Sequence, residues 1–212
     1  MRIAVNTHYT HSYQPLADII LPVLKRYCDK HGYDLHITLS DSEFHFVKTK
    51  DARKLLDNYD VVMSIELDIL ITNLNYKIED WLDEKHEMYI TTDVNNVNGG
   101  VMIFKSTHFC KELLDRVEMS SYVYGDEQNF FEENNFYEIK RCEHPCFNSI
   151  PYDYYAPSFG YIGWDKLDPK PLKPTHEMGC WEVGDFACHL PGRNLADRIS
   201  IFNEIKKDII YE

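Results

Sequence analysis

The sequence predicts an α/β fold built on a mixed, mostly parallel central sheet with helices on its flanks. Up to residue 65, apolar stretches of strand type alternate with stretches of helical periodicity, in the order strand, helix, strand, helix, strand. That order is typical of parallel strands joined by crossover helices. In addition, a chain of 212 residues with 44% hydrophobic content can bury one sizeable core. We therefore expect a single domain over residues 1–212.

Changes in hydrophobic period indicate the elements of the amino-terminal part. The polar residues 7–12 predict a loop after the first strand. Gly32 marks the end of the first helix, because glycine readily adopts the left-handed conformation that ends helices. The expected elements are a strand at 2–6, a helix at 15–31, a strand at 33–39, a short helix at 51–56 and a buried strand at 60–65.

Patterns in the carboxyl-terminal part are weaker. Asn98-Gly99-Gly100 predicts a turn into a strand, where a ligand could approach the backbone closely, and Ser106 is the expected cap of the next helix. From 141 to 191 the pattern dissolves into Pro, Gly, Tyr and Trp, which favours an irregular binding surface over a disordered linker. The expected elements are a weak helix at 77–83, strands at 88–92 and 100–104, helices at 106–119 and 126–134, and a final helix at 194–209.

The charge balance limits the classes of partner. The formal net charge is −13 and the 22 Lys and Arg residues form no basic run, so we expect neither nucleic acid nor an anionic membrane surface as a partner. No apolar stretch approaches the ~20 residues of a membrane span, and the first residues predict a strand instead of a signal peptide. The six cysteines favour free thiols, and Cys142, His144 and Cys146 match no strong zinc-binding spacing. We therefore expect a cytoplasmic protein.

Two acidic residues follow the buried strand. Glu66 and Asp68 are one residue apart, so strand alternation points both side chains to the same side, at the carboxyl end where open α/β sheets bind ligands. At about 4 Å, each carboxylate would repel a phosphate charge by ~4 kcal/mol at an effective dielectric of 20. The pair therefore suits a divalent metal that holds a diphosphate. The alternative is a pair of exposed acids that cap a helix.

Four signals in a fixed order extend this hypothesis. They are the strand with its acidic pair, Asn98-Gly99-Gly100-Val101-Met102-Ile103-Phe104, Asp126-Glu127-Gln128, and His189-Leu190-Pro191-Gly192. With them the chain resembles the GT-A glycosyltransferases, in particular the glycogenin-like and yeast galactosyl- and mannosyltransferase-like families, over about residues 1–195. As a whole it resembles the amino-terminal domain of a large chlorella-virus glycosyltransferase. The resemblance implies a GT-A (Rossmann-like) domain, with a nucleotide-binding part at about 1–105 and an acceptor- and metal-closing part at about 106–212, to which a longer chain could add further domains.

The resemblance also implies a metal centre. Asp68 is the second acidic position, which binds the metal directly in these families, and His189 is a further metal contact. Glu66 stands where the families have Asp, so we rank it below Asp68 as a ligand. Gly192 would let the backbone approach the diphosphate. Such ligands imply Mn²⁺, or Mg²⁺, as the cofactor. His189 could instead be a hydrogen-bonded core histidine.

Roles in donor binding and catalysis follow by the same resemblance. Asn6, Thr7 and Tyr9 would hold the nucleotide, Lys48 or Arg53 would reach the nucleotide or a phosphate, Asp93, Asn98 and Gly99 would line the donor sugar, and Asp126, Glu127 and Gln128 would lie beside the reacting carbon. In retaining members this last group supports departure from the front face, and in inverting members a carboxylate is the base. The pattern is closer to the retaining families. Asp126 could equally serve as a helix cap.

The expected function is metal-dependent transfer of a hexose from a UDP-sugar to a glycan, a glycoprotein or another hydroxyl acceptor. The viral resemblance would place that activity in the host cytoplasm. A sugar-nucleotide nucleotidyltransferase would share the fold and the metal chemistry, but its first loop should carry glycines and basic residues, and residues 7–12 contain neither Gly nor Lys. A noncatalytic carbohydrate-binding module would explain the aromatic residues between 141 and 191, but not the paired acids.

Overall fold

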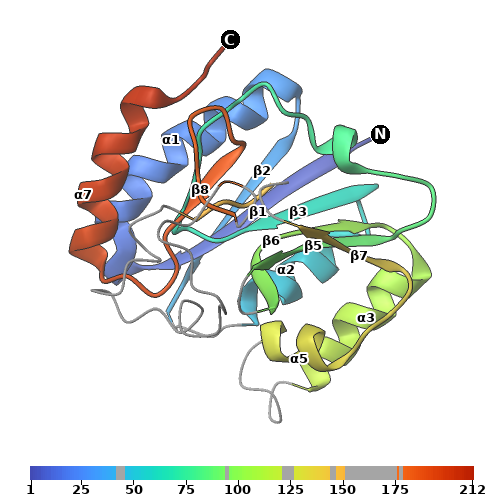
Figure 1. Ribbon diagram of the computed structural model, residues 1–212. Helices are drawn as coiled ribbons and strands as arrows, with labels where there is room; N and C mark the ends of the chain where they lie inside the picture. The colour runs from blue at the N-terminus through green and yellow to red at the C-terminus, as the bar shows by residue number, and fades with distance from the viewer. Residues whose placement is uncertain (42–45, 94–95, 121–126, 144–146, 151–175, 177–178) are drawn as a thin grey trace, which may run out of the picture.

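A six-stranded mixed sheet forms the centre of the molecule. The computed structural model describes residues 1–41, 46–93, 96–120, 127–143, 147–150, 176 and 179–212. The sheet has the order β2-β1-β3-β6-β5-β7 (Figure 1). Its strands are β1 (Ile3–Thr10), β2 (Asp34–Ser40), β3 (Val61–Ile65), β5 (Met88–Asp93), β6 (Asn96–Lys105) and β7 (Ile139–Glu143). Because β6 is antiparallel to both β3 and β5 while the other pairs are parallel, β6 alone runs against the rest of this described sheet.

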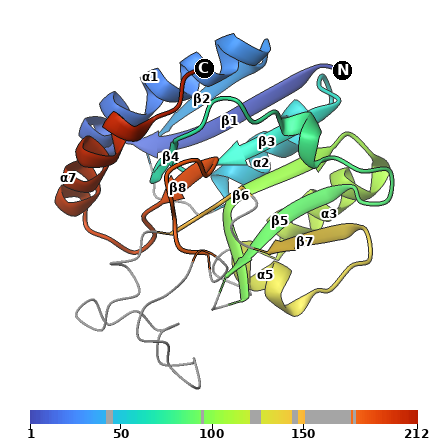
Figure 2. The ribbon, with the colours of Figure 1, turned by 45° about the horizontal axis from the view of Figure 1, so that its top comes forward.

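Helices cover both faces of the sheet. Figure 2 shows α1 (Gln14–His31) and α7 (Leu195–Ile205) on one side, and α2 (Val47–Leu55), α3 (His108–Met119) and α5 (Glu127–Glu133) on the other. The alternation along β1 and β3 explains why both faces are apolar. Val5 and Met63 pack into the core under α1 and α7, whereas Ala4 and Val62 pack under α2, α3 and α5. The parallel start and the flanking helices confirm the predicted fold class.

A second, two-stranded sheet lies beside the end of β3. Its strands are β4 (Ile69–Ile71) and β8 (Ala187–His189), which pair antiparallel with Ile69 opposite His189. The sequence analysis predicted neither of these strands, nor β7; residues 141 to 191, which include β8 and most of β7, were expected to be irregular. Three-residue strands such as β4 and β8 are too short to show a period, and they form only when their partner is brought alongside.

Several predicted boundaries differ from the structure. The first strand continues to Thr10 instead of ending in a loop at residue 7, because β2 pairs with it as far as Thr10 opposite Ser40. Thr107, not Ser106, caps α3, since its side chain accepts a hydrogen bond from the backbone N–H of Cys110. Within the described residues, 3₁₀ turns are formed by η1 (His11–Tyr13), η2 (Ile78–Trp81) and η6 (Lys206–Asp208).

Asn98, Gly99 and Gly100 lie inside β6 and do not form the predicted turn. The β5–β6 pairing shifts register between Ile90 and Thr91, so that Ile90 faces Met102 while Thr91 faces Asn98. On its other side, β6 stays in register with β3 to the pair Ile65 and Val101. Residues 99–101 therefore form a bulge away from β5, which turns this part of β6 toward the end of β3.

Within the described residues, no helix combines the length and the apolar character needed to cross a bilayer. His144 and Cys146, considered above for zinc, lie outside the described residues.

Candidate functional site

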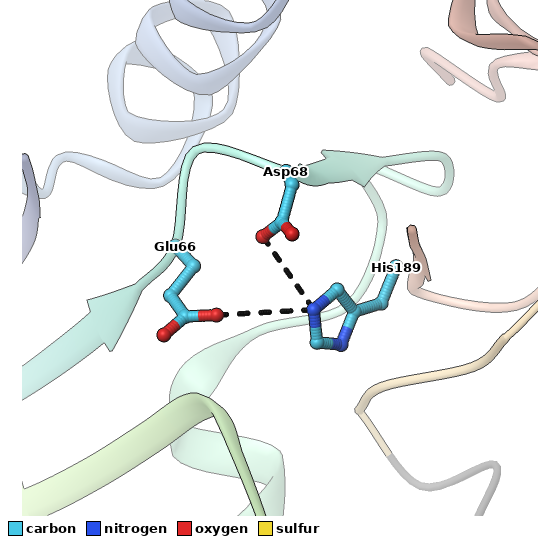
Figure 3. A group of neighbouring side chains, drawn as sticks. All are labelled: Glu66, Asp68 and His189. Atoms are coloured by element: carbon cyan, nitrogen blue, oxygen red, sulfur yellow. Dashed lines mark ion pairs between the residues drawn. The ribbon is translucent and has the colours of Figure 1, made fainter. Parts of the chain in front are cut away.

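Three side chains meet where β3 ends. Glu66 follows β3 directly, Asp68 precedes β4, and His189 is the last residue of β8. The Nε2 atom of His189 lies 3.5 Å from Oδ1 of Asp68 and 3.8 Å from Oε2 of Glu66 (Figure 3). One potential ligand atom from each residue lies within 4.8 Å of the other two. The structure therefore brings together the three residues that the sequence analysis assigned to a metal.

Backbone contacts hold His189 in this position. Its N–H donates a 2.7 Å hydrogen bond to the carbonyl of Ser149, and the N–H of Leu190 donates a 3.0 Å bond to the carbonyl of Asp68. Gly100 is required on the facing strand, because a Cβ there would lie 2.6 Å from Cε1 of His189. The imidazole is thus fixed by three segments that are far apart in the sequence.

The three side chains, called here the metal triad, fit a divalent cation. His189 is 2% exposed, and neither nitrogen of its ring has a hydrogen-bond partner among the described residues. A buried imidazole without partners is costly unless something else satisfies it. One imidazole and two carboxylates are donors that suit Mn²⁺, and with more oxygen ligands Mg²⁺. The donor set and the unsatisfied ring nitrogens therefore agree with the predicted cofactor.

Lys48 lies behind the triad and links it to α5. Its ammonium group is buried, donates to Oε1 of Glu66 and to the carbonyl of Gly99 at 2.9 Å, and pairs with Oε1 of Glu127 at 2.5 Å. Burial lowers the pKa of Lys48, but the two carboxylates outweigh it and raise that pKa above its ordinary value. Burial likewise raises the pKa of Glu66, yet Lys48 and His189 outweigh it and hold that pKa at about 2. Glu66 is therefore ionised at neutral pH.

The amino-terminal residues of α5 pack against the bulge of β6. Gln128 accepts a 3.3 Å hydrogen bond from the N–H of Gly99 through Oε1. A Cβ at Gly99 would lie 3.1 Å from Oε1 of Glu127, so glycine allows this close packing. Burial raises the pKa of Glu127, and the charge of Glu66 adds to the rise while Lys48 opposes it. Asp126, assigned with these two residues, lies outside the described residues.

Asn98 belongs to a buried polar network on the other side of the bulge. Its Oδ1 accepts hydrogen bonds from the N–H of Gly100 at 3.0 Å and from Nδ2 of Asn148 at 2.8 Å. The same amide group of Asn148 reaches Oγ1 of Thr91 at 3.3 Å. Asn148 was not among the predicted site residues. The side chain of Asp93, assigned to the donor sugar together with Asn98, lies outside the described part of the structure.

The predicted nucleotide residues lie on or next to the end of β1. Asn6 and Thr7 are buried, and within the part of the chain that the structure describes Oδ1 of Asn6 and Oγ1 of Thr7 have no hydrogen-bond partner. Nδ2 of Asn6 donates to the carbonyl of Lys48 at 3.2 Å. The hydroxyl of Tyr9 donates to Oε1 of Gln14 at 3.2 Å. These residues thus share the carboxyl edge of the sheet with the metal triad.

Of two further predicted residues, Gly192 lies shortly after β8, whose last residue belongs to the metal triad, whereas Arg53 lies outside the site. Gly192 follows β8 with a φ of +68°, a conformation that favours glycine. Arg53, in contrast, pairs with Asp115 of α3 at 2.9 Å and with Asp57 at 3.3 Å. Its guanidinium therefore bridges α2 and α3 and does not join the Lys48 and Glu66 cluster.

Arg198 is a site residue that the sequence analysis missed. Its Nη2 lies 2.7 Å from Oδ2 of Asp68, and its Nε donates to the carbonyl of Leu190 at 3.1 Å. A single arginine in the middle of a predicted helix gives no local signal of such a role, because its partner lies 130 residues earlier in the chain. The sequence analysis predicted only a final helix at 194–209.

Neither the protein-family models nor the curated protein sequences give a match to this chain. Solved structures do match. A glycosyltransferase involved in glycosylation of the major capsid of PBCV-1 is 16% identical, with a TM-score of 0.69 over 96% of this chain and 100% of that chain. GlyE of Streptococcus pneumoniae TIGR4 is 14% identical, with a TM-score of 0.62 over 97% of this chain and 60% of its own length. The galactosyltransferase LgtC, solved with donor and acceptor sugar analogues, is 12% identical, with a TM-score of 0.54 over 97% and 96%.

These structural neighbours are GT-A glycosyltransferases. The chain is a small α/β domain with the GT-A fold, as the resemblance implied. At 11 to 16% identity the comparisons support the fold, and the chemistry has to be argued from the site.

Proposed function

We propose that this protein is a metal-dependent glycosyltransferase that moves a hexose from a UDP-sugar to a hydroxyl group of a glycan or glycoprotein. The observation that carries the proposal is the metal triad at the carboxyl edge of a GT-A sheet, where β3 ends. Ligands bind at this edge in open α/β folds. Two carboxylates and an unsatisfied imidazole at one sheet edge can bind a cation. The bound cation could in turn bind an anionic donor such as a nucleoside diphosphate sugar.

Each residue of the triad has a role in this proposal. Asp68, His189 and Glu66 would hold Mn²⁺ or Mg²⁺. When bound, such an ion supplies Lewis acidity toward the departing nucleoside diphosphate. Lys48 favours the ionised form of Glu66, since its ammonium lowers the pKa of Glu66 against the effect of burial. The site is thereby prepared for a cation at neutral pH.

A nucleotide donor is supported by the end of β1. Oδ1 of Asn6 and Oγ1 of Thr7 are buried without hydrogen-bond partners in the described structure, on the strand next to β3, which the acidic pair follows. Polar atoms of this kind can receive the donors of a base or a ribose. The choice of uracil and of a hexose rests on the family resemblance, and Tyr9, Asp93, Asn98, Gly99 and Gly192 remain proposed donor contacts.

A retaining mechanism is favoured by the environment of Glu127. A general base has to reach the hydroxyl that it deprotonates. The side chain of Glu127 is only 5% exposed and pairs with Lys48, which makes it a poor base for an incoming acceptor. Gln128 is neutral and bonded to the bulge of β6. These two residues therefore support stabilisation of the donor face, with Asp126 as the third proposed member.

The test is a screen of nucleotide-sugars for Mn²⁺-dependent transfer and hydrolysis, with product stereochemistry read by NMR. We expect turnover of a UDP-hexose with retention, and loss of that turnover in Asp68→Asn with unchanged far-UV circular dichroism. Turnover in EDTA equal to that in Mn²⁺ would overturn the metal role. Synthesis of a nucleotide-sugar from a nucleoside triphosphate and a sugar phosphate would indicate the nucleotidyltransferase instead, and metal-independent sugar binding without nucleotide affinity would indicate the binding module.

A further inference from the structure

Each carboxylate of the metal triad already has its own cation. Glu66 pairs with Lys48, and Asp68 pairs with Arg198. In the second pair both side chains are mostly buried, with 11% of Asp68 and 12% of Arg198 exposed. Little water separates these charges, so their interaction is stronger than that of a surface pair.

The two oxygens of Asp68 are divided between two partners. Oδ1 faces Nε2 of His189 at 3.5 Å, whereas Oδ2 forms an ion pair with Nη2 of Arg198 at 2.7 Å. The guanidinium is held by a second bond, from Nε to the carbonyl of Leu190, and it lies 5.9 Å from the centre of the Tyr13 ring. Arg198 is thus a fixed positive charge on a carboxylate that belongs to the metal triad.

The charges around the triad explain what this arrangement would do. The carboxylates of Glu66, Asp68 and Glu127 face the ammonium of Lys48 and the guanidinium of Arg198. At most, three formal negative charges face two positive ones. A divalent ion would therefore leave uncompensated positive charge in a mostly buried site, which is unfavourable. An anionic diphosphate would restore the balance.

We propose that Arg198 is a positioning residue that makes cation binding by the triad dependent on the anionic donor. Without a donor, the guanidinium lowers the affinity of Asp68 for a divalent ion by repelling that ion. With a donor, the diphosphate offsets the same positive charge, and cation and nucleotide strengthen each other's binding by equal factors. The proposal rests on the proposed function, because it takes the triad to be a metal site for a diphosphate donor.

The experiment measures binding of Mn²⁺ by electron paramagnetic resonance, with and without saturating UDP. Arg198→Gln removes the charge and keeps a hydrogen-bond donor for the carbonyl of Leu190, whereas Arg198→Lys keeps the charge. The matched control is Arg116→Gln on α3, which removes an exposed arginine stacked on Phe136 at 5.2 Å. Thermal melting of each variant checks that it is folded.

In the wild type we expect weak Mn²⁺ binding that UDP strengthens strongly. In Arg198→Gln, we expect Mn²⁺ alone to bind about tenfold more tightly, with a corresponding fall in the factor by which UDP strengthens it, because a nearby positive charge has been removed. Arg198→Lys and Arg116→Gln should match the wild type. Unchanged or weaker Mn²⁺ binding by folded Arg198→Gln without UDP would overturn the role of Arg198.

The two proposals fail in different ways. If the wild type binds Mn²⁺ and UDP cooperatively but Arg198→Gln does so to the same extent, the proposal for Arg198 falls and the metal site stands. If the wild type binds no Mn²⁺ even with UDP, the proposed function falls, and the inference on Arg198 falls with it.

Discussion

The two sides of the metal triad use the same chemistry with different degrees of enclosure. On the side of α2 and α5, Lys48 is 1% exposed and satisfied by Glu66, Glu127 and the carbonyl of Gly99. On the side of α7, Arg198 meets Asp68 and one carbonyl, and its side chain retains 12% of its exposure. The comparison indicates that Lys48 is part of the folded framework. Arg198 is the more accessible positive charge, which we propose repels a bound cation until a diphosphate offsets it.

The largest effect should come from Lys48→Met. Removal of the ammonium leaves Glu66 and Glu127 close together without their shared cation, and breaking a buried ion pair in this way costs about 3–5 kcal/mol. Urea denaturation should show that loss in the free energy of unfolding. Lys54→Gln on the same helix, which removes an exposed partner of Asp51, should change it by less than about 0.5 kcal/mol. A loss of that small size in Lys48→Met would contradict the framework role.

The bulge of β6 offers a second comparison, because its two glycines face opposite sides of the site. Gly100→Ala would place a Cβ 2.6 Å from the ring of His189, whereas Gly99→Ala would place one 3.1 Å from a carboxylate oxygen of Glu127. We expect Gly100→Ala to cost about 1–3 kcal/mol of stability, the usual cost of overpacking, and to weaken Mn²⁺ binding. Gly99→Ala should cost less, since the contact is longer. If Gly100→Ala and Gly99→Ala lost equal free energy of unfolding and equal Mn²⁺ affinity, the expected difference between the two glycines would be refuted.

His189→Ala tests the metal side directly. Loss of the imidazole should weaken Mn²⁺ binding by more than about tenfold. Removal of a residue that only supports a metal ligand already costs about tenfold, and removal of the ligand itself should cost more. Isothermal titration of the protein with Mn²⁺ in the presence of UDP would measure the loss of Mn²⁺ affinity, and a titration with UDP in EDTA would give the metal-independent background. His176→Ala, which removes the partner of Asp185 at 2.7 Å, is the matched control and should bind Mn²⁺ as the wild type does. If Mn²⁺ binding by His189→Ala equals that of the wild type, His189 is not a metal ligand, and the alternative of a core histidine is favoured.

The smallest effect is expected from Asn148→Ala. The variant loses the bond from Asn148 to Asn98, but Oδ1 of Asn98 keeps its bond from the N–H of Gly100. We therefore expect a loss of about 1 kcal/mol in the free energy of unfolding. Exposed Asn203→Ala on α7 provides the baseline. A loss no larger than that baseline would show that the buried network does not depend on Asn148.

Much of the fold could be predicted because its elements carry their own signals. The helix predicted at 15–31 is α1, which ends at Gly32 with a φ of +73°. The buried strand before the acidic pair is β3, all five residues of which are buried. The helix repeats its period several times and β3 is a continuous apolar run, so both can be recognised locally. The three-residue strands β4 and β8 carry no such pattern, and β7, with the mixed sequence Ile-Lys-Arg-Cys-Glu, has no apolar run. These three strands were missed.

The sequence by itself determined the parallel start of the sheet and the acidic pair at its edge, because apolar runs and strand alternation are local properties; His189 was added to that pair only by the family resemblance. Only the tertiary structure decided that Lys48 joins Glu66 to Glu127, that Gly99 and Gly100 form a bulge, and that Arg198 pairs with Asp68. The reason is physical. Charges choose their partners by distance in the folded chain, and those distances depend on how separate elements pack, which no short stretch of sequence records.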